Sequence, residues 1–466
     1  VEHNPLYTAP ELEGLLNDHG ARVAISWDKT ASTLERLRST TPLETIVSVN
    51  MVDAMPPLKR LALRLPLPPL AAKREQLTSP APNTVEWSTL IGAAIGGDGS
   101  DLDVPEISQD DIALILYTSG TTGKPKGALL SHGNLIANAI QGKAWVPQMG
   151  KQQERFLAAL PIFHAYGMTT LCIFSIYLGA ELILVPSPQM PLIMDIVKKR
   201  TPTWLPGVPT LYQKIMDAAE EKDVDLSGIR NAFSGAATLP VEIVERWEAM
   251  TGGRLVEGFG MTETSPVLTA NPMNGKHRPG YVGVPFPDTE VRIANPENLD
   301  ETQPDGQPGE MLARGPQIFQ GYFGNAAATE KTFHNGWFRT GDMALMEPDG
   351  YIKLVSRIKE IIITGGFNVY PAEVEEAIAQ HPDVVDVAAV GRPRQDGSED
   401  VVGCVTLRDG AVLDPEGLKE FCRERLTRYK VPRTFYHFED LARDHLGKIR
   451  RHQVRKDLLE LLEAKA

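Results

Sequence analysis

Cysteine is scarce in this chain of 466 residues. Only Cys172, Cys404 and Cys422 occur, and they lie far apart in the sequence. A disulfide framework or a structural zinc site needs more cysteines at short, regular spacings, so both are excluded. We expect a cytoplasmic protein, because a reducing compartment suits free thiols. We also expect no signal peptide, since the opening residues read as the middle of a structured region.

Positive charge is in deficit, with 47 Lys and Arg against 60 Asp and Glu, a net charge of −13 and a pI of about 5.4. A field of that sign repels nucleic-acid backbones, so we expect no nucleic-acid partner. The remaining composition is ordinary, with 42% hydrophobic and 23% charged residues, which excludes disorder and coiled coil as the main theme. The length suggests two or three domains.

An uninterrupted apolar run of membrane-spanning length is missing. The most apolar stretch extends from Ala165 to Val185, but Gly179 breaks it and Glu181 lies inside it. These interruptions favour a buried helix followed by a buried strand over a membrane span.

Residues 51–110 are rich in proline and poor in strand signals. Within them Lys59, Arg60 and Arg64 alternate with leucines. One interpretation is a peripheral contact with a membrane surface. The favoured interpretation is a surface excursion whose leucines pack on the main body, because the segment is short and broken by prolines.

From residue 111 to about residue 355, strand and helix patterns alternate without a linker, which predicts a large α/β domain. After Gly283 the pattern changes to short strands with Pro and Gly turns, which indicates a smaller β subdomain. We predict strands at 112–117, 156–160, 182–185, 204–207 and 255–259, helices at 134–139, 191–199 and 240–250, and the β subdomain strands at 289–293, 309–314, 337–346 and 350–355.

The last 110 or so residues predict a small, separate α/β domain, and we place the boundary so that the large domain covers residues 1–356 and the small one 357–466. A helix with Pro at its first turn is expected from Pro371. A final basic helix is expected from His452.

The strongest local signal is residues 117–128, Tyr-Thr-Ser-Gly-Thr-Thr-Gly-Lys-Pro-Lys-Gly-Ala. Its glycines let backbone N–H groups approach an anion, and its hydroxyls and lysines supply further donors. This composition predicts a phosphate cradle. It is not a Walker A loop, because Pro125 stands where that motif needs Ser or Thr.

Three further segments carry weaker signals. Residues 257–266, Glu-Gly-Phe-Gly-Met-Thr-Glu-Thr-Ser-Pro, follow a predicted strand, and Glu263 is a hard oxygen ligand suited to Mg²⁺. Asp342 could accept hydrogen bonds from ribose hydroxyls. The third segment contains Ser356 and Arg357 and continues into the Gly-Gly-Phe-Asn-Val-Tyr-Pro-Ala-Glu-Val-Glu of residues 365–375.

Together and in this order, these motifs resemble the adenylate-forming superfamily of acyl-CoA synthetases, nonribosomal peptide synthetase adenylation domains and luciferases. With Pro-Ile-Phe-His-Ala-Tyr-Gly-Met at residues 161–168, the chain is most similar to bacterial long-chain fatty-acid–CoA ligases. The resemblance implies a large N-terminal and a small, mobile C-terminal α/β domain. It also implies an AMP-forming acid–thiol ligase that uses ATP, Mg²⁺, a fatty acid and coenzyme A.

In such an enzyme a carboxylate attacks the α-phosphate of ATP, and the resulting acyl-adenylate then passes its acyl group to the thiol of coenzyme A. Two like charges at ~4 Å repel by about 4 kcal/mol at an effective dielectric of 20. A metal ion and a lysine can neutralise that repulsion. No nucleophilic side chain is needed, which fits the absence of a Gly-x-Ser-x-Gly elbow.

The resemblance also implies roles for individual residues. Those expected to bind ATP comprise an outer-phosphate loop (Thr118, Ser119, Gly120, Thr121, Thr122, Gly123 and Lys126), the adenine walls (Gly235, Ala236 and Ala237, then Gly258, Phe259, Gly260 and Met261), the α-phosphate contact Thr262, the Mg²⁺ contacts Thr118 and Glu263, and the ribose residues Asp342 and Arg357.

The remaining implied roles concern the acyl transfer. Lys448 is expected to bridge the attacking carboxylate and the α-phosphate. The small domain is expected to turn about Lys359 and to present Gly365 and Gly366 to the pantetheine arm. His164 matches a gate at the acyl–CoA tunnel, although a structural histidine fits nearly as well.

Three departures from the family pattern stand out. About 100 residues usually precede the segment that matches Val1, so we expect the chain to be a fragment of a longer domain. Ser356 stands where Asp or Gly is common. Asp444 lies near Lys448 and could compete for it. The alternatives that remain are an aryl- or medium-chain acid–CoA ligase of the same fold and a non-catalytic remnant that binds nucleotide or acyl groups.

Overall fold

The computed structural model describes residues 1–94, 105–118, 125–185, 188–364, 367–394, 399–444 and 447–463. The chain divides into two compact units. The first unit comprises Val1–His132 with Gln320–Asn325, and the second comprises Gly133–Phe319 with Ala326–Ala466. The expected boundary between residues 356 and 357 stays a prediction.

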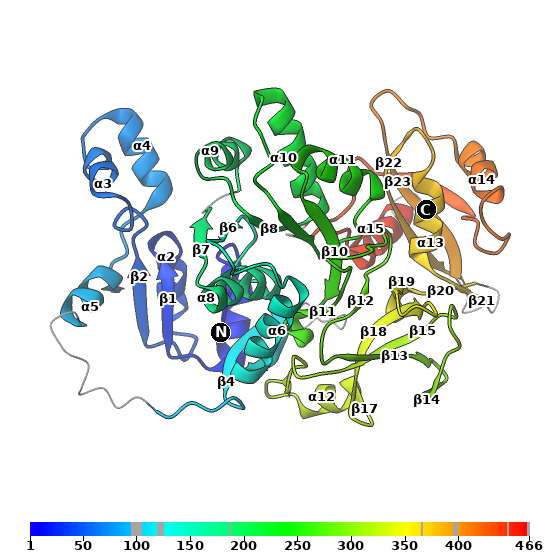
Figure 1. Ribbon diagram of the computed structural model, residues 1–466, viewed down its shortest axis with the longest axis horizontal. Coiled ribbons are helices and arrows are strands. Elements are labelled where there is room, and N and C mark those ends of the chain that lie inside the picture. The colour runs from blue at the N-terminus through cyan, green and yellow to red at the C-terminus, as the bar shows by residue number, and fades with distance from the viewer. Residues whose placement is uncertain are drawn as a thin grey trace. The chain divides into compact units, whose positions relative to one another are not determined.

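The first unit contains a parallel three-stranded sheet in the order β1-β2-β3 (Figure 1). Helix α1 begins after Thr8, whose backbone N–H donates to Glu11, and it ends at Gly20 in a left-handed conformation. Leucines of α1 and α2 cover this sheet and form its core with Ile46. The bounds are α1 (Ala9–His19), β1 (Val23–Trp27), α2 (Asp28–Leu37), β2 (Thr45–Val49) and β3 (Val85–Glu86).

A second sheet of the first unit has the order β16-β5-β4. Strands β4 and β5 form an antiparallel hairpin whose last pair is Thr118 with Lys126. The hairpin therefore holds both ends of the predicted phosphate loop. The bounds are β4 (Ile112–Thr118), β5 (Lys126–Ser131) and β16 (Gly321–Tyr322).

The proline-rich segment forms three short helices, α3 (Pro57–Leu63), α4 (Pro68–Leu77) and α5 (Trp87–Ala94). The favoured prediction that its leucines pack on the main body is wrong for most of them. Leu63 is buried, but Leu58 is 82% exposed and Leu61 is 63% exposed. The reason is that α3 turns only one side toward the protein.

The second unit is built on a seven-stranded sheet in the order β12-β11-β10-β9-β8-β6-β7. Strands β6 to β10 run parallel, and β11 and β12 add to one end in antiparallel fashion. The bounds are β6 (Arg155–Ala158), β7 (Glu181–Leu184), β8 (Trp204–Gly207), β9 (Asn231–Ser234), β10 (Arg254–Gly260), β11 (Val267–Ala270) and β12 (Val284–Pro285).

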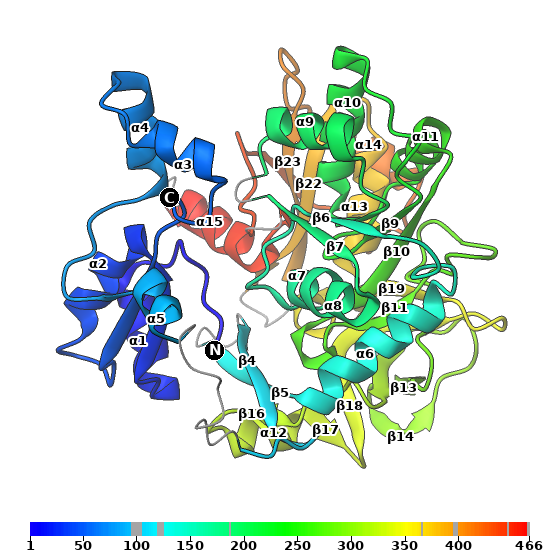
Figure 2. The same cartoon turned by 60° about the vertical axis from the view of Figure 1, so that its left-hand side comes forward.

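Helices cover both faces of this sheet. Figure 2 shows α9, α10 and α11 together above the strands, and α6, α7 and α8 below them. Tyr212 of α10 packs edge-on against Trp247 of α11, whereas Trp204 of β8 packs against Phe174 of α8. The bounds are α6 (His132–Trp145), α7 (Ala165–Gly167), α8 (Phe174–Leu178), α9 (Met190–Arg200), α10 (Pro209–Lys222) and α11 (Val241–Thr251).

The most apolar stretch of the sequence is helical and then extended, as predicted. A π-helical turn, η1 (Met168–Ile173), joins α7 to α8, and Leu171 within it is fully buried. The prediction of a buried strand is wrong, because β7 is the last strand of the sheet and Leu184 is 61% exposed. In the part of the chain that is described, we find no helix long and apolar enough to cross a membrane.

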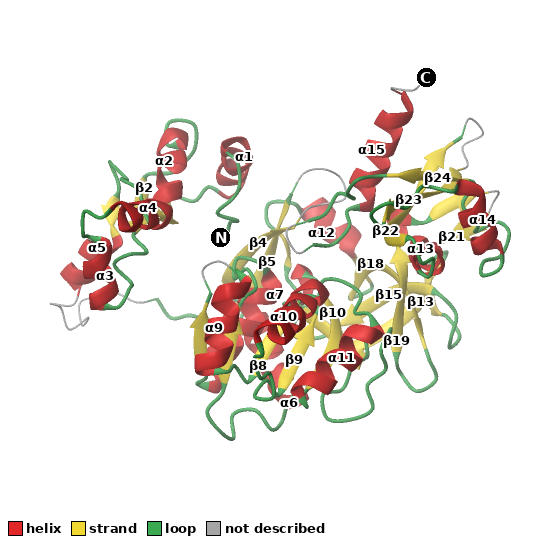
Figure 3. Cartoon of the chain, turned by 90° about the horizontal axis from the view of Figure 1, so that it is seen from above, coloured by secondary structure: helices red, strands yellow, loops and turns green. Residues whose placement is uncertain are grey.

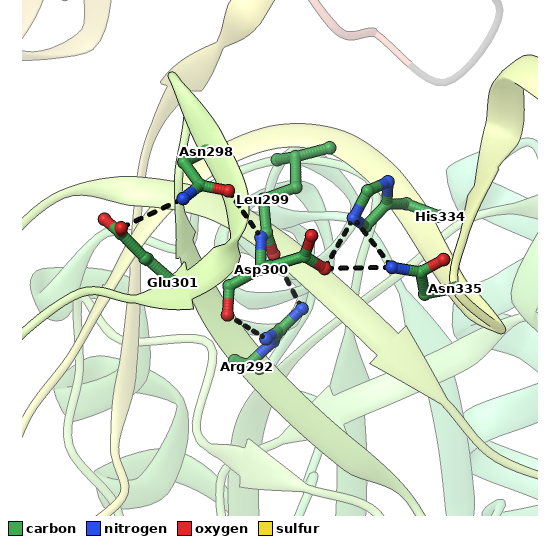
Figure 4. A network of polar contacts seen from close by, with 7 residues as sticks. All are labelled: Arg292, Asn298, Leu299, Asp300, Glu301, His334 and Asn335. Carbon is green, nitrogen blue, oxygen red and sulfur yellow. Dashed lines mark hydrogen bonds and ion pairs between the residues drawn. The ribbon is translucent and has the colours of Figure 1, made fainter.

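The β subdomain predicted after Gly283 is a six-stranded antiparallel sheet. A polar network ties its β13–β14 hairpin to the end of β17 (Figure 4). Arg292 donates to the carbonyls of Leu299 and Asp300, and the Asp300 carboxylate contacts His334 and Asn335 at 2.9 Å each. The bounds are β13 (Glu290–Asn295), β14 (Asn298–Thr302), β15 (Gly309–Arg314), α12 (Ala326–Thr332), β17 (Phe333–His334), β18 (Trp337–Met346) and β19 (Ile352–Arg357).

The C-terminal region has the predicted α/β character, with a three-stranded sheet in the order β22-β23-β24. Figure 3 shows α13 and α14 beside this sheet, and α13 and α15 both contact β22. The mixed α/β fold with a small C-terminal part is confirmed. The bounds are β20 (Ile362–Thr364), β21 (Phe367–Val369), α13 (Pro371–Ala379), β22 (Val384–Pro393), β23 (Glu399–Leu407), α14 (Pro415–Arg423), β24 (Thr434–His437) and α15 (Arg451–Glu463).

Candidate active site

The predicted adenine segments lie where three parallel strands end. The register pairs Gly207 of β8 with Ser234 of β9, and Ser234 with Glu257 of β10. The carboxyl ends of parallel strands meet at one edge of a sheet, where ligands of open α/β folds bind. The loop after Ser234 and the residues after Glu257 therefore share that edge, as the sequence motifs require.

The loop of residues 235–237 is shaped by Tyr166. The buried Tyr166 hydroxyl donates to the carbonyls of Phe233 and Gly207, and so ties the ends of β8 and β9 together. A Cβ at Gly235 would lie 3.2 Å from the Tyr166 ring. Ala236 has φ 68° and is exposed, and Ala237 is half-buried. Tyr166 was not predicted as a site residue, although it lies in the motif of residues 161–168 that carries the family resemblance.

The backbone of residues 258–261 lies close against Phe233 and Pro266. A Cβ at Gly258 would lie 2.3 Å from the Phe233 ring, and one at Gly260 would lie 1.8 Å from the carbonyl oxygen of Pro266. The chain doubles back here, because the Met261 N–H donates to that same carbonyl at 3.0 Å. Gly260 is exposed, whereas Phe259 and Met261 are half-buried.

Thr262 and Glu263 follow directly in a short helical turn, η2 (Thr262–Thr264). Glu263 is buried, and its carbonyl accepts from the N–H of Phe319 at 2.9 Å. Thr262 is half-buried. Because the turn starts where Gly260 lets the chain double back, the position of the Glu263 carboxylate depends on that glycine.

Glu257 was quoted in the motif but was not predicted as a site residue. It is buried, and the backbone N–H of Leu239 hydrogen-bonds to its carboxyl group. Burial raises its pKa to about 8, against the opposing effect of the Leu239 hydrogen bond. Glu257 thus connects the start of one predicted adenine wall to the end of the loop that forms the other.

Asp342 and Arg357 are paired by strand register. They are partners in the antiparallel β18–β19 ladder, and Arg357 Nε lies 2.7 Å from Asp342 Oδ1. Asp342 is buried, and its Oδ2 has no hydrogen-bond partner within the described ranges. Desolvation raises the pKa of Asp342 to about 6, although the positive charges of Arg357 and Lys448 work against that rise.

Lys448 lies in a tight turn before α15. The Asp444 carboxylate accepts from the backbone N–H of Lys448 at 2.9 Å, and Gly447 has φ 83°. Lys448 is exposed, and desolvation is the largest cause of its lowered pKa. Arg357 lowers that pKa further, and Asp342 partly restores it.

Arg451, at the start of α15, was not predicted. Its guanidinium bonds Glu375 at 2.7 and 2.6 Å and Glu360 at 2.7 Å. Burial alone would lower its pKa, but these carboxylates raise it well above the usual value. Arg451 therefore fixes the helix that follows Lys448, and only its place in a basic pair could have drawn attention to it.

His164 precedes the short helix α7, and its Nδ1 accepts from the Tyr166 N–H at 3.2 Å. This is the cap that a structural histidine would supply, while the predicted gating role stays a prediction. In the first unit, Lys126 Nζ lies 5.0 Å above the Tyr322 ring, and the Thr118 hydroxyl lies 3.5 Å from the Lys126 carbonyl. Ser119, Gly120, Thr121, Thr122 and Gly123, and likewise Gly365 and Gly366, lie outside the described residues.

Two family models match the chain. The model described as AMP-binding enzyme covers residues 1–323, and the AMP-binding enzyme C-terminal domain covers residues 373–448. The chain belongs to the AMP-binding enzyme family. It is an adenylate-forming acyl-CoA ligase, an AMP-forming acid–thiol ligase that uses ATP.

Three similar proteins illustrate the range of relatives. A long-chain-fatty-acid–CoA ligase of Bacillus subtilis is 36% identical over 99% of this chain and 81% of its own length. A feruloyl-CoA synthase of Amycolatopsis is 36% identical over 77% of this chain and 73% of its own length. The ATP-bound structure of MatB from Rhodopseudomonas palustris is 28% identical, with a TM-score of 0.75 over 97% of this chain and 92% of that one.

Gly260→Ala tests the close approach at the end of β10. The added methyl group would force the chain away from Pro266 and displace Glu263, so we expect adenylate formation to fall on the order of 10²-fold. The rate of pyrophosphate release in the presence of a fatty acid and ATP measures the effect. Gly14→Ala, where nothing lies within 4 Å of the new Cβ, is the control. Full activity of the Gly260→Ala enzyme would show that the approach is not needed.

Glu257→Gln tests the buried carboxyl group. Folding raises its pKa from 4.5 to about 8, so its contribution to stability is complete below 4.5 and is lost as the pH rises toward 8. The unfolding free energy of the wild type should therefore fall across this window by up to about 1.4 kcal/mol per pH unit from this group, and that slope should shrink in Glu257→Gln. Urea unfolding at several pH values measures both slopes.

The control for this experiment is Glu242→Gln, at an exposed position of α11. It should leave the pH dependence of the wild type unchanged. Equal slopes for the wild type and Glu257→Gln would mean that Glu257 is not held protonated by burial.

Proposed function

We propose that the chain is a long-chain fatty-acid–CoA ligase, which activates a fatty acid with ATP and Mg²⁺ to an acyl-adenylate and then forms the thioester with coenzyme A. The observation that supports the choice of acid is the apolar lining of a small cavity of about 30 Å³ in the second unit, which would have to widen to admit an alkyl chain. Its lining consists of Asn138, Ala139, Gly142, Trp145, Val146, Thr169, Thr170, Phe174, Trp204, Phe233, Val267, Met273 and Phe286.

The polar groups of this lining are already occupied. Trp145 Nε1 donates to the Asn271 carbonyl at 2.9 Å, and Trp204 Nε1 donates to the Thr170 carbonyl at 3.2 Å. The Asn138 amide donates to the Val267 carbonyl at 2.8 Å. A ligand in the cavity would therefore meet hydrocarbon and aromatic surface, which favours an alkyl chain over a polar acid. The flexible side chain of Met273 can move to admit a longer chain.

An aromatic acid is the alternative substrate. The 36% identity to a feruloyl-CoA synthase favours it, and the two indoles and three phenyl rings of the lining would also suit an aromatic ring. We rank it second because the matched part is shorter, 77% of this chain against 99% for the fatty-acid ligase.

Asp342 and Arg357 are proposed to bind the ribose. The buried Oδ2 of Asp342 lacks a partner among the described atoms, and a ribose hydroxyl would supply the missing donor. Arg357 keeps the other oxygen occupied and the carboxylate in place. The loop of residues 235–237 and the segment 258–261 are proposed to enclose the adenine, since both follow the carboxyl ends of neighbouring parallel strands.

Lys448 is proposed to contact both the attacking carboxylate and the α-phosphate, with Thr262 as a further contact of that phosphate. Asp342 favours the charged form of the Lys448 ammonium group. A cation held beside the phosphate stabilises the negative charge that develops there. This charge is what the approach of two anions requires.

Glu263 is proposed as the protein's carboxylate ligand for Mg²⁺, together with the Thr118 hydroxyl. A buried carboxylate oxygen is a suitable hard ligand, and Mg²⁺ commonly takes one carboxylate plus phosphate oxygens. Magnesium would supply charge neutralisation at the phosphates.

The loop from Thr118 to Gly123 and Lys126 are proposed to bind the outer phosphates, and Gly365 and Gly366 to guide the pantetheine arm of coenzyme A. The hairpin pair of Thr118 and Lys126 supports the first role, because it brings together the two ends of a sequence segment rich in glycine, hydroxyl groups and lysine.

Lys448→Ala separates the two half-reactions. Adenylate formation should fall roughly 10²–10³-fold, because one charged donor at the phosphate is lost, while conversion of supplied acyl-adenylate to the thioester should persist. Pyrophosphate release and thioester formation measure the two steps. Lys456→Ala, on the exposed side of α15, should leave both unchanged. Undiminished pyrophosphate release from Lys448→Ala would remove Lys448 from the reaction.

Ala139→Leu tests the cavity. The larger side chain should fill space otherwise available to the alkyl chain and lower kcat/KM for palmitate and oleate by roughly tenfold or more, with little change for hexanoate. Ile136→Leu, on the exposed face of the same helix, is the control. Equal losses for all acids would show that the cavity does not hold the chain, and a wild-type preference for ferulate would favour the alternative substrate.

A further inference from the structure

Helix α3 of the first unit presents a row of leucines to solvent. Leu58 and Leu61 are 82% and 63% exposed, and their spacing of three residues places them on one side of the helix. Leu65, just after the helix ends at Leu63, is 46% exposed. Leu63, on the opposite side, is only 6% exposed and anchors the helix to the protein.

The row continues beyond the helix, because Leu67, just before α4, is 52% exposed. Single exposed leucines are common on protein surfaces, but contiguous ones mark an interaction site. We call Leu58, Leu61, Leu65 and Leu67 the leucine ridge. The helices that carry the ridge are joined by a hydrogen bond. Arg74 of α4 donates to the Leu63 carbonyl at 3.0 Å, which holds α3 and α4 together.

Basic residues flank the leucine ridge. Between Ala54 and Arg74 the sequence contains Lys59, Arg60, Arg64, Lys73 and Arg74 and no Asp or Glu. Lys59, Arg64 and Lys73 are exposed. Arg64 has one acidic neighbour, Asp53 at 3.9 Å, and both side chains lie in water, where such a pair is weak. This cationic segment belongs to a chain with a net charge of −13.

From this arrangement we propose that the leucine ridge and its flanking basic residues bind the interface of an anionic lipid bilayer. Leucines enter the boundary between headgroups and acyl chains, while Lys59, Arg60 and Arg64 contact the lipid phosphates. The net negative charge of the protein would repel it from an anionic membrane. A local excess of positive charge around exposed leucines offsets that repulsion where the leucines enter the bilayer. A nucleic acid would match the charge but not the leucines.

The proposal goes beyond the proposed ligase activity and is tested without any substrate. The full chain is sedimented with vesicles of phosphatidylcholine alone or of phosphatidylcholine with phosphatidylglycerol. We expect binding to the anionic vesicles, weakened by added salt, and little binding to the neutral ones. The double variant Leu58→Asp/Leu61→Asp should lose about tenfold or more of the partition coefficient.

A matched control is Leu6→Asp, which alters a leucine that is 85% exposed elsewhere in the first unit. It should bind vesicles as the wild type does. The double variant Lys59→Ala/Arg64→Ala should lose the preference for anionic vesicles. Thermal melting and pyrophosphate release with hexanoate should be unchanged in all three variants, which keeps a loss of binding distinct from misfolding or from failure of the ligase proposal.

Three results would overturn the proposal. The first is equal and low sedimentation of the wild type with both kinds of vesicle. The ridge variant could bind anionic vesicles as tightly as the wild type. Finally, the wild type could form concentration-dependent dimers that Leu58→Asp/Leu61→Asp abolishes, without vesicle binding, which would make the ridge a protein interface.

Discussion

The rest of the proposed site depends on a charge cluster formed by the buried Asp342 with Arg357 and Lys448. Asp342 is taken out of water, so its pKa rises to about 6, and it stays ionised most readily with Arg357 at 2.7 Å and Lys448 nearby. Each member of the cluster comes from a different place in the sequence. β18 and β19 supply the carboxylate and the guanidinium through one register pair, and the turn before α15 supplies the lysine.

The groups around this cluster are held by several polar contacts. Lys448 is held from both sides, because Asp444 binds its backbone N–H and Arg451 ties the next helix to Glu360 and Glu375. The end of β10 is held by close packing contacts instead of charges. Gly258 and Gly260 leave no room for a methyl group, so the chain before the turn that carries Glu263 needs glycine at both positions. A charged ligand would thus meet groups that need little rearrangement.

The sequence predicted the parts of the site that are local in the chain. The glycine- and hydroxyl-rich loop, the segment around Glu263 and the Gly-Lys of the last turn are recognisable because a few consecutive residues carry the signal. The same holds for strands such as 204–207 and 309–314, whose bounds agree with the structure. The family comparisons confirm the fold and the reaction class.

Non-local properties could not be predicted. Tyr166 links two strand ends, and Glu257 is buried beneath a loop from another part of the chain, so their roles follow from tertiary packing alone. The exposure of Leu58 and the edge position of β7 were predicted wrongly for the same reason, because hydrophobicity in a sequence does not reveal which side of an element meets water.

The nucleotide product tests the central claim most directly. The claim is that the buried cluster and Glu263 serve attack of a carboxylate on the α-phosphate of ATP. Incubation of the protein with magnesium, ATP, coenzyme A and a panel of lipophilic acids, followed by separation of the nucleotides, should give AMP and pyrophosphate in step with acyl-CoA. Formation of ADP and orthophosphate instead would contradict the account.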